Sequence, residues 1–243
     1  TAGNVAVGYG ASKLLATGTY NTVMGFNAMD AANGSESYMI AIGTDALGNM
    51  DNNSSSQNTA IGVGAMDGVG AYIATNNVMI GLNAGGGTWT ASTCDGNVGI
   101  GNAVMDAAMA DSSYNVGIGN ACLTDLTTGD GNTCVGKDSG ADINTGDNNV
   151  CIGKAAGDAL TTGDDNILIG RDVAMSGVGV DSEIVIGVGA TGKGQNQTVI
   201  GNTDMTHLWA AEDGDAVVVC GGIDMSNTQP AAQAATSVTA EVL

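Results

Sequence analysis

Short apolar runs recur along the chain at a nearly constant distance, and each run ends in a glycine. Within a run, two mostly β-branched positions enclose a third apolar position, a pattern typical of a β-strand of about five residues. The marker glycines are Gly8, Gly25, Gly43, Gly62, Gly81, Gly101, Gly119, Gly136, Gly153, Gly170, Gly187 and Gly201. Their spacings are 17, 18, 19, 19, 20, 18, 17, 17, 17, 17 and 14 residues, so twelve copies of one unit follow each other, with insertions in the first half.

An asparagine stands four positions before the glycine in nine of the copies. Met39, Glu183 and Gln197 take this position in the other three. A unit of 14 to 20 residues is too short for a pair of helices. Because stacked units bury a core that one unit cannot bury alone, we predict an all-β protein with a parallel β-solenoid of about 12 coils over residues 1–203.

Both faces of each predicted strand are apolar, whereas a strand with one face in water alternates apolar with polar residues. We expect the branched positions to face the coil interior and the middle positions to form a second face that identical chains cover. This interpretation predicts a homotrimer. The candidates for the trimer face are Ala6, Val23, Ala41, Ala60, Met79, Gly99, Gly117, Cys134, Cys151, Leu168, Val185 and Val199.

The units Asn58–Gly62 and Asn4–Gly8 resemble the head repeats of YadA-like trimeric autotransporter adhesins, which also occur in bacteriophage tail fibres. The resemblance implies a left-handed β-roll, intertwined or side by side in a homotrimer, that forms the shaft or head of an adhesion fibre. The Thr-Thr-Gly-Asp-x-Asn linkers at 127–132 and 161–166 are more similar to the phage versions. The alanines that fit the small-residue corner of the family are Ala11, Ala28, Ala46, Ala65, Ala84, Ala156 and Ala190.

Composition excludes several classes of function. Five basic residues against 25 acidic ones give a net charge of −20, which argues against binding to nucleic acid or to anionic membranes. The five cysteines have no CxxC spacing, so a zinc site or a redox dithiol is not expected. Cys134 and Cys151 occupy the same strand position, where they serve as small apolar fillers.

Two ladders of charge repeat every 17 residues. The cations are Lys137, Lys154 and Arg171, and the acids are Asp130, Asp147 and Asp164. One hypothesis is that the cations hold an anionic glycan, or that the acids bind Ca²⁺ together with Asn132, Asn149 and Asn166. The other, which we favour, is that the ladders pair with each other or with a neighbouring chain. We expect no cofactor.

No residue pattern predicts catalysis. His207 is the only histidine and we expect it to pack at a junction. The carboxyl pairs Asp164-Asp165 and Glu212-Asp213 lack the apolar environment that glycoside hydrolysis requires. The longest insertions, 48–57 and 85–96, are expected as surface loops for recognition, and Trp89 in the second loop either stacks on a sugar or caps the coil below it.

After Gly201 the repeat breaks. We expect a trimer-capping or connecting segment over 204–228, with a strand at 216–223, and an Ala-rich linker or tail over 229–243. Because residue 1 is Thr, we expect a processed or partial chain. The leading hypothesis is a non-enzymatic, trimeric fibre segment of a phage tail or virion that contacts other fibre proteins and a host-surface glycan or protein. The alternatives are a bacterial cell-surface adhesin head and a glycan-cleaving tailspike.

Overall fold

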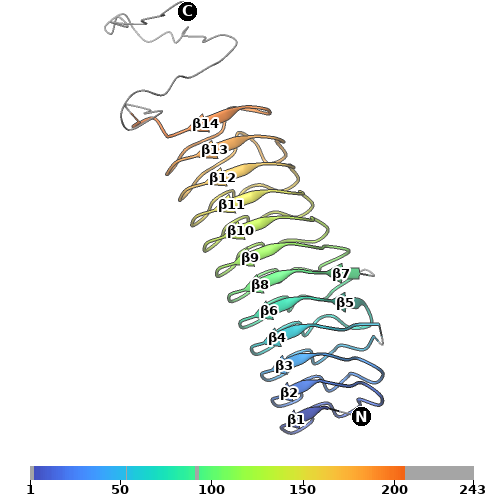
Figure 1. Ribbon diagram of the computed structural model, residues 1–243. Helices are drawn as coiled ribbons and strands as arrows, with labels where there is room; N and C mark the ends of the chain where they lie inside the picture. Colours follow the sequence, from blue (N-terminus) through green and yellow to red (C-terminus); the bar gives the residue numbers. More distant parts are fainter. Residues whose placement is uncertain (1–2, 53, 91–92, 206–243) are drawn as a thin grey trace, which may run out of the picture. The chain divides into compact units, whose positions relative to one another are not determined.

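The computed structural model describes residues 3–52, 54–90 and 93–205, and among these it contains strands, turns and bends but no helix. Twelve strands form one parallel sheet in the order β1-β2-β3-β4-β6-β8-β9-β10-β11-β12-β13-β14 (Figure 1). The predicted all-β parallel solenoid is confirmed. The strands are β1 (Val5–Val7), β2 (Thr22–Met24), β3 (Ile40–Ile42), β4 (Thr59–Ile61), β6 (Val78–Ile80), β8 (Val98–Ile100), β9 (Val116–Ile118), β10 (Thr133–Val135), β11 (Val150–Ile152), β12 (Ile167–Ile169), β13 (Ile184–Ile186) and β14 (Thr198–Ile200).

A second, two-stranded parallel sheet lies in the region of the insertions. It consists of β5 (Ile73–Thr75) and β7 (Thr93–Asp95). Ser56 also forms parallel bridges with Ser37 and with Thr75. The prediction that 48–57 and 85–96 are simple loops is therefore wrong in part. Insertions in adjacent coils lie one strand spacing apart. Their backbone N–H and C=O groups can therefore pair with each other, as strands do.

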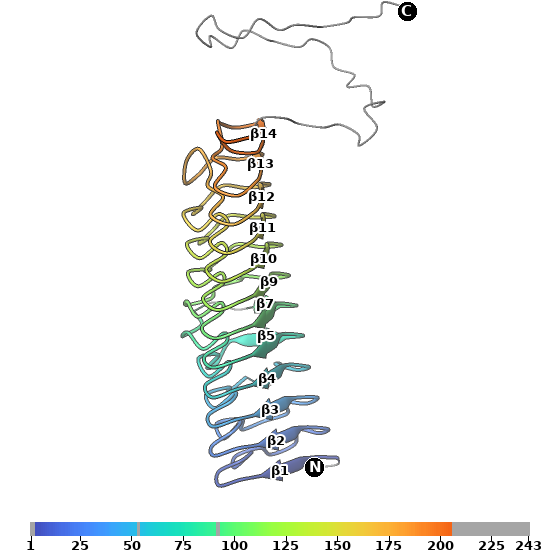
Figure 2. The ribbon, with the colours of Figure 1, turned by 90° about the vertical axis from the view of Figure 1, so that its left-hand side faces the viewer.

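Strand pairing joins equivalent positions of the repeat. Cys134, for example, is paired with Gly117 on one side and with Cys151 on the other. Each position of the sequence unit therefore becomes a column that runs along the stack, and the main sheet forms one wall of the compact unit Thr1–Asp204 (Figure 2). The positions expected at 204–228 and 229–243 lie, apart from residues 204 and 205, outside the described residues.

The middle residue of each strand points into the coil, and its two neighbours point outward. From β2 to β13 every middle residue is buried, while the flanking residues are half-buried or exposed. The predicted orientation is therefore wrong, because most of the proposed trimer-face residues are the core of their own chain. Only the two end positions differ, with Ala6 exposed and Val199 half-buried. The buried members are Val23, Ala41, Ala60, Met79, Gly99, Gly117, Cys134, Cys151, Leu168 and Val185.

The narrow interior explains this orientation. A Cβ atom added at Gly117 would lie 2.9 Å from Cγ2 of Val104 and 3.1 Å from Cε of Met105. A Cβ at Gly99 would lie 2.5 Å from Sδ of Met79. Side chains from the adjacent strand and from the corner after β8 already fill this space, so the size of the middle residue varies along the column. A column made only of Ile and Val would not fit there.

A ladder of buried asparagine side chains lies at the start of seven successive strands of the main sheet, from β4 to β12. The backbone N–H of Asn149 donates to Oδ1 of Asn132 at 2.9 Å, and Nδ2 of Asn149 donates to the same oxygen at 3.0 Å and to the Gly163 carbonyl at 2.8 Å. The same arrangement joins Asn58, Asn77, Asn97, Asn115, Asn132, Asn149 and Asn166. A buried backbone N–H requires an acceptor, and the asparagine of the adjacent coil supplies it.

The glycine after each strand permits close contact between backbones. Gly119 has a φ of +148°, and a Cβ atom there would lie 2.2 Å from the carbonyl oxygen of Gly136. No side chain can occupy that space, and the backbone angle is one that L-residues rarely adopt. The repeated glycine is thus required by the spacing between coils.

Replacing Asn132 with Ala is expected to lower the free energy of unfolding by about 3 kcal/mol, because donors of Asn149 lose their buried acceptor. Urea unfolding followed by circular dichroism at a fixed protein concentration measures this loss. The matched control is Asn120→Ala, since Asn120 is exposed and should change stability by less than about 0.5 kcal/mol. Equal stability of the two variants would contradict the role of the ladder.

Candidate interaction surface

The outer face of the main sheet is an uninterrupted apolar strip. Two side chains per strand form it, and none of them is charged. With strands about 4.8 Å apart and about 3.3 Å per residue, the strip measures roughly 55 Å by 10 Å. Its residues are Val5, Val7, Thr22, Met24, Ile40, Ile42, Thr59, Ile61, Val78, Ile80, Val98, Ile100, Val116, Ile118, Thr133, Val135, Val150, Ile152, Ile167, Ile169, Ile184, Ile186, Thr198 and Ile200.

This strip is accessible to solvent within the single chain. Ile118 is 38% exposed in the middle of the sheet, and Ile152 is 40% exposed. Monomeric proteins rarely expose continuous apolar patches of more than a few hundred Å². The sequence predicts that another chain covers one of the two apolar faces, and in the structure the exposed face consists of the branched columns.

One border of the strip is the column of residues that directly follow the repeat glycines. Near the N-terminus it is aromatic, and the rings of Tyr9 and Phe26 stack with centroids 5.5 Å apart and planes 15° apart. Further along, the column carries the three predicted cations. Lys137 pairs with Asp138, and Nη1 of Arg171 lies 3.2 Å from Oδ2 of Asp172.

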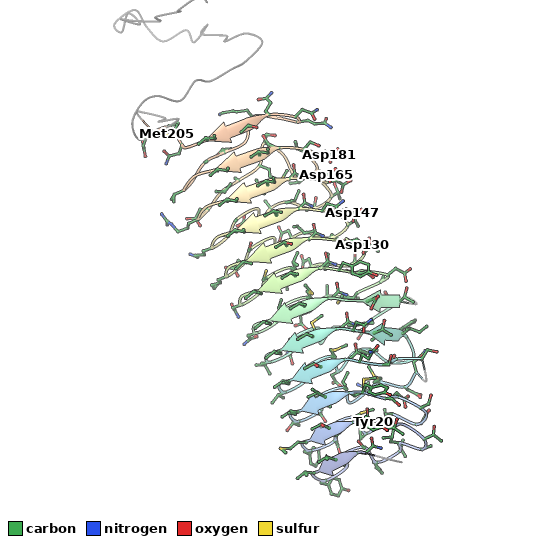
Figure 3. The ribbon with its side chains drawn as sticks, in the orientation of Figure 1. Tyr20, Asp130, Asp147, Asp165, Asp181 and Met205 are labelled. Atoms are coloured by element: carbon green, nitrogen blue, oxygen red, sulfur yellow. The ribbon has the colours of Figure 1, made fainter. Side chains whose placement is uncertain are left out.

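The other border precedes the strands. Near the N-terminus, the exposed rings of Tyr20 and Tyr38 stack with centroids 5.3 Å apart and planes 13° apart. Tyr20 lies on the outside of the stack where β2 begins (Figure 3). A Cβ atom at Gly3 would lie 2.7 Å from Cδ1 of Tyr20, so this glycine gives the ring room to lie flat over the coil below. The aromatic columns thus continue the apolar strip on both sides.

The same border is acidic in the later coils. Oδ1 of Asp147 accepts the backbone N–H of Asp130 at 2.8 Å, and Oδ1 of Asp164 accepts that of Asp147 at 2.8 Å. Asp181 continues the column by accepting the N–H of Asp164 at 3.0 Å. Asp130, Asp147, Asp165 and Asp181 follow the edge at which the strands begin (Figure 3).

The two charge ladders therefore do not pair with each other inside the chain. The ion pairs found among the described residues join Lys137 and Arg171 to the aspartates next to them in sequence. The strand lies between the cation column and the acid column, which separates their side chains. Pairing within the chain, one of the expected outcomes, is wrong, whereas pairing with a neighbouring chain stays a prediction.

The proposed Ca²⁺ ligand set is not available. Asn132, Asn149 and Asn166 are fully buried, and each amide bonds to the asparagine of the preceding coil. In the described part of the chain, no cluster of three or more His, Cys, Asp or Glu side chains has the arrangement of a metal site. The asparagines thus hold the coils together and do not face a ligand.

Trp89 is a core residue. Its side chain is 1% exposed, and Nε1 donates to the Gly85 carbonyl at 3.1 Å. Of the two interpretations, packing within the coil is the one that the structure shows, and the ring offers no surface to a sugar. The indole fills a coil in which neighbouring glycines leave space, and burial of the ring with its N–H satisfied is the stable arrangement.

The thiols also belong to the interior. Cys94, Cys122, Cys134 and Cys151 are free and buried. Burial raises the pKa of Cys94 to about 11, so its thiol is neutral near pH 7. Hydrogen bonding with Cys122 and Cys151, together with burial, raises the pKa of Cys134. These thiols fill space, as expected for Cys134 and Cys151.

The remaining predicted positions lie outside the described residues or outside the strip. His207, Glu212-Asp213, the fifth cysteine and the strand expected at 216–223 lie outside the described residues. In the Asp164-Asp165 pair, the Asp164 carboxylate is engaged with a backbone N–H. A helix with the length and hydropathy of a membrane span does not occur in the described ranges.

Sequence reasoning missed a second acidic column. Asp125, Asp142 and Asp158 occupy adjacent coils, and their spacings of 17 and 16 residues were the available signal. Burial raises the pKa of Asp142, and the charges of Asp125 and Asp158 raise it further. By contrast, the pKa of Asp95 is lowered, chiefly because the Asn76 side chain donates a hydrogen bond to its carboxylate.

The variant Asp142→Asn is expected to melt at a higher temperature than the parent at pH 7. A carboxyl with a raised pKa in the folded state binds its proton more tightly there, so its ionised form destabilises the fold, and this penalty disappears as pH falls through the raised pKa. Thermal unfolding from pH 7 to pH 4 checks this, and the difference in melting temperature should shrink toward acid pH.

The control is Asp95→Ala, which should lower the melting temperature at pH 7, because the Asp95 carboxylate accepts hydrogen bonds from Thr75 and Asn76. Its effect should persist from pH 7 to pH 4 and fade only at lower pH, as the parent carboxyl becomes protonated on passing through its lowered pKa. Stabilisation by both variants, or by neither, would contradict this assignment.

Comparisons with known protein families, with curated proteins and with solved structures gave no match. The feature that requires explanation is the apolar strip on the outside of the sheet.

Proposed function

We propose that this chain is a structural and adhesion protein, a homotrimeric fibre segment of a phage tail or virion that takes part in host attachment. The observation that carries the proposal is the uncharged strip of Val, Ile and Thr along the whole outer face of the sheet. In a single chain this strip would expose apolar area to water over roughly 55 Å of length. Association along the strip removes that area from water.

The regularity of the strip favours copies of the same chain as the partner. Its side chains repeat at the strand spacing over twelve strands. A surface with that spacing is matched by an equal surface on an identical chain, and cyclic assemblies are the common way in which identical chains associate. Three copies, with their sheets directed toward a central axis, cover all three strips at once.

The shape and chemistry of the unit support a structural role. Each coil contacts only its neighbours, as in other solenoid proteins, so length is gained by repetition. Acidic columns on the surface maintain solubility. The described carboxylates serve as hydrogen-bond acceptors or lie in exposed columns, and the proposal assigns them no catalytic step. The resemblance to fibre and adhesin head repeats points to attachment as the role of such an assembly.

Light scattering on the purified chain tests the proposal. The chain has a mass of 23.8 kDa, and we expect a solution mass three times as large over a range of micromolar concentrations. The variant Ile118→Asp introduces a charge into the middle of the strip and should shift the mass toward that of one chain, since the carboxylate would lose its water on association.

The matched control is Thr145→Asp, because Thr145 is an exposed residue outside the strip and should leave the mass unchanged. Circular dichroism of each variant reports whether the coils remain folded. A parent chain that stays a folded monomer at micromolar concentration would overturn the proposal.

A further inference from the structure

We infer that the two borders of the apolar strip recognise each other in neighbouring copies, and that they fix the copies in the same direction and in the same register. In this arrangement, the border after the strand of one copy lies against the border before the strand of the next copy. The inference rests on the proposed self-association and goes further, because it names the side chains that set its geometry.

The border after the strand changes character along the stack. In the first five coils it is uncharged, and in the coils of β10, β11 and β12 it carries the cations. Lys154 and Arg171 are exposed, and Lys154 forms no ion pair with any other described residue. In order, the residues of these five coils are Tyr9, Phe26, Thr44, Val63 and Leu82, and the uncharged Asn102 and Asn120 follow before the cations.

The border before the strand changes at a similar height. In its first coils it carries Tyr20 and Tyr38 and no charge. From the coil of β8 onward it carries acids, with the exposed ring of Tyr114 among them. Asp165 in the coil of β12 is exposed, and its side chain forms no hydrogen bond or ion pair with another described residue. The acidic members are Asp95, Asp130, Asp147, Asp164, Asp165 and Asp181.

The matching groups do not pair within one chain. Asp165 and Arg171 flank β12 (Ile167–Ile169) on opposite sides, and no ion pair joins them among the described residues. The cations that do pair use the adjacent aspartates instead. Lys154 and Asp165 have no side-chain partner among the described residues, and the Arg171 pair is exposed, so these charges can contact a different copy at the same height.

Rotation about a central axis parallel to the stack relates the copies and brings these columns together. It places the end of each strand in one copy beside the start of the same strand in the next copy, so aromatic borders meet aromatic borders and Arg171 meets Asp165. Reversing one copy would instead superpose β12 on β3 and bring Arg171 near Thr44. The charges would then face an uncharged border and lose water without gaining a partner.

Cysteine cross-linking tests this arrangement in the full chain. The background is Cys220→Ser, and the four cysteines in the described part are buried. We would prepare Asp165→Cys with Arg171→Cys in one chain, treat it with a short bismaleimide, and examine it on a denaturing gel. The expected product is a covalent species of three chains, because each copy links to the next around the axis.

Two control variants define the alternatives. Arg171→Cys alone should remain uncross-linked, and Arg171→Cys with Thr44→Cys should give no product, since it reports the reversed direction. Light scattering before cross-linking shows whether the chain associates at all, independently of how the borders pair. A multimer that links only through the Arg171 and Thr44 positions, or not at all, overturns the border pairing and leaves self-association standing. A monomer overturns both.

Discussion

The hydrogen bond between stacked asparagines is the interaction on which the rest of the structure depends. The residue before each asparagine has a positive φ, as at Asn148 with 58°, and the turn there leaves the next backbone N–H buried. The asparagine of the preceding coil accepts that N–H, so no coil is satisfied without its neighbour. From β4 to β12 this requirement fixes the position of each strand in its unit, in agreement with the parallel, in-register pairing of the sheet.

The register in turn decides what each column of side chains can be. Inside the coil, space is shared between the strand and the corner that follows it, and Gly117 is possible because Val104 and Met105 fill the volume beside it. Outside the coil no such exchange is needed, and the branched columns remain uniform. Insertions that lengthen the units of the first half are accommodated around β5 and β7, away from this outer face.

The sequence alone was sufficient to predict the period, the strands and the solenoid, because these follow from the spacing of Asn and Gly. It was not sufficient to orient the strand, since hydrophobicity does not distinguish inside from outside when both faces are apolar. The distinguishing signal was size. The inner column ranges from Gly99 to Met79, as expected where volume is exchanged, whereas the outer one stays Val, Ile, Thr or Met. Trp89 was assigned to a loop because an insertion next to glycines does not reveal that it turns inward.

Uniformity of an exposed column has a physical cost, because a flat apolar strip favours association with many surfaces. The borders restrict this tendency. Aromatic rings at one end and separated charges at the other give the strip a direction, which a uniform column of Ile and Val does not have. An identical chain in the same orientation matches the strand spacing, the apolar strip and the order of the borders together. Any other partner would have to reproduce all three features, and for this reason self-association about a common axis is the arrangement that the surface favours.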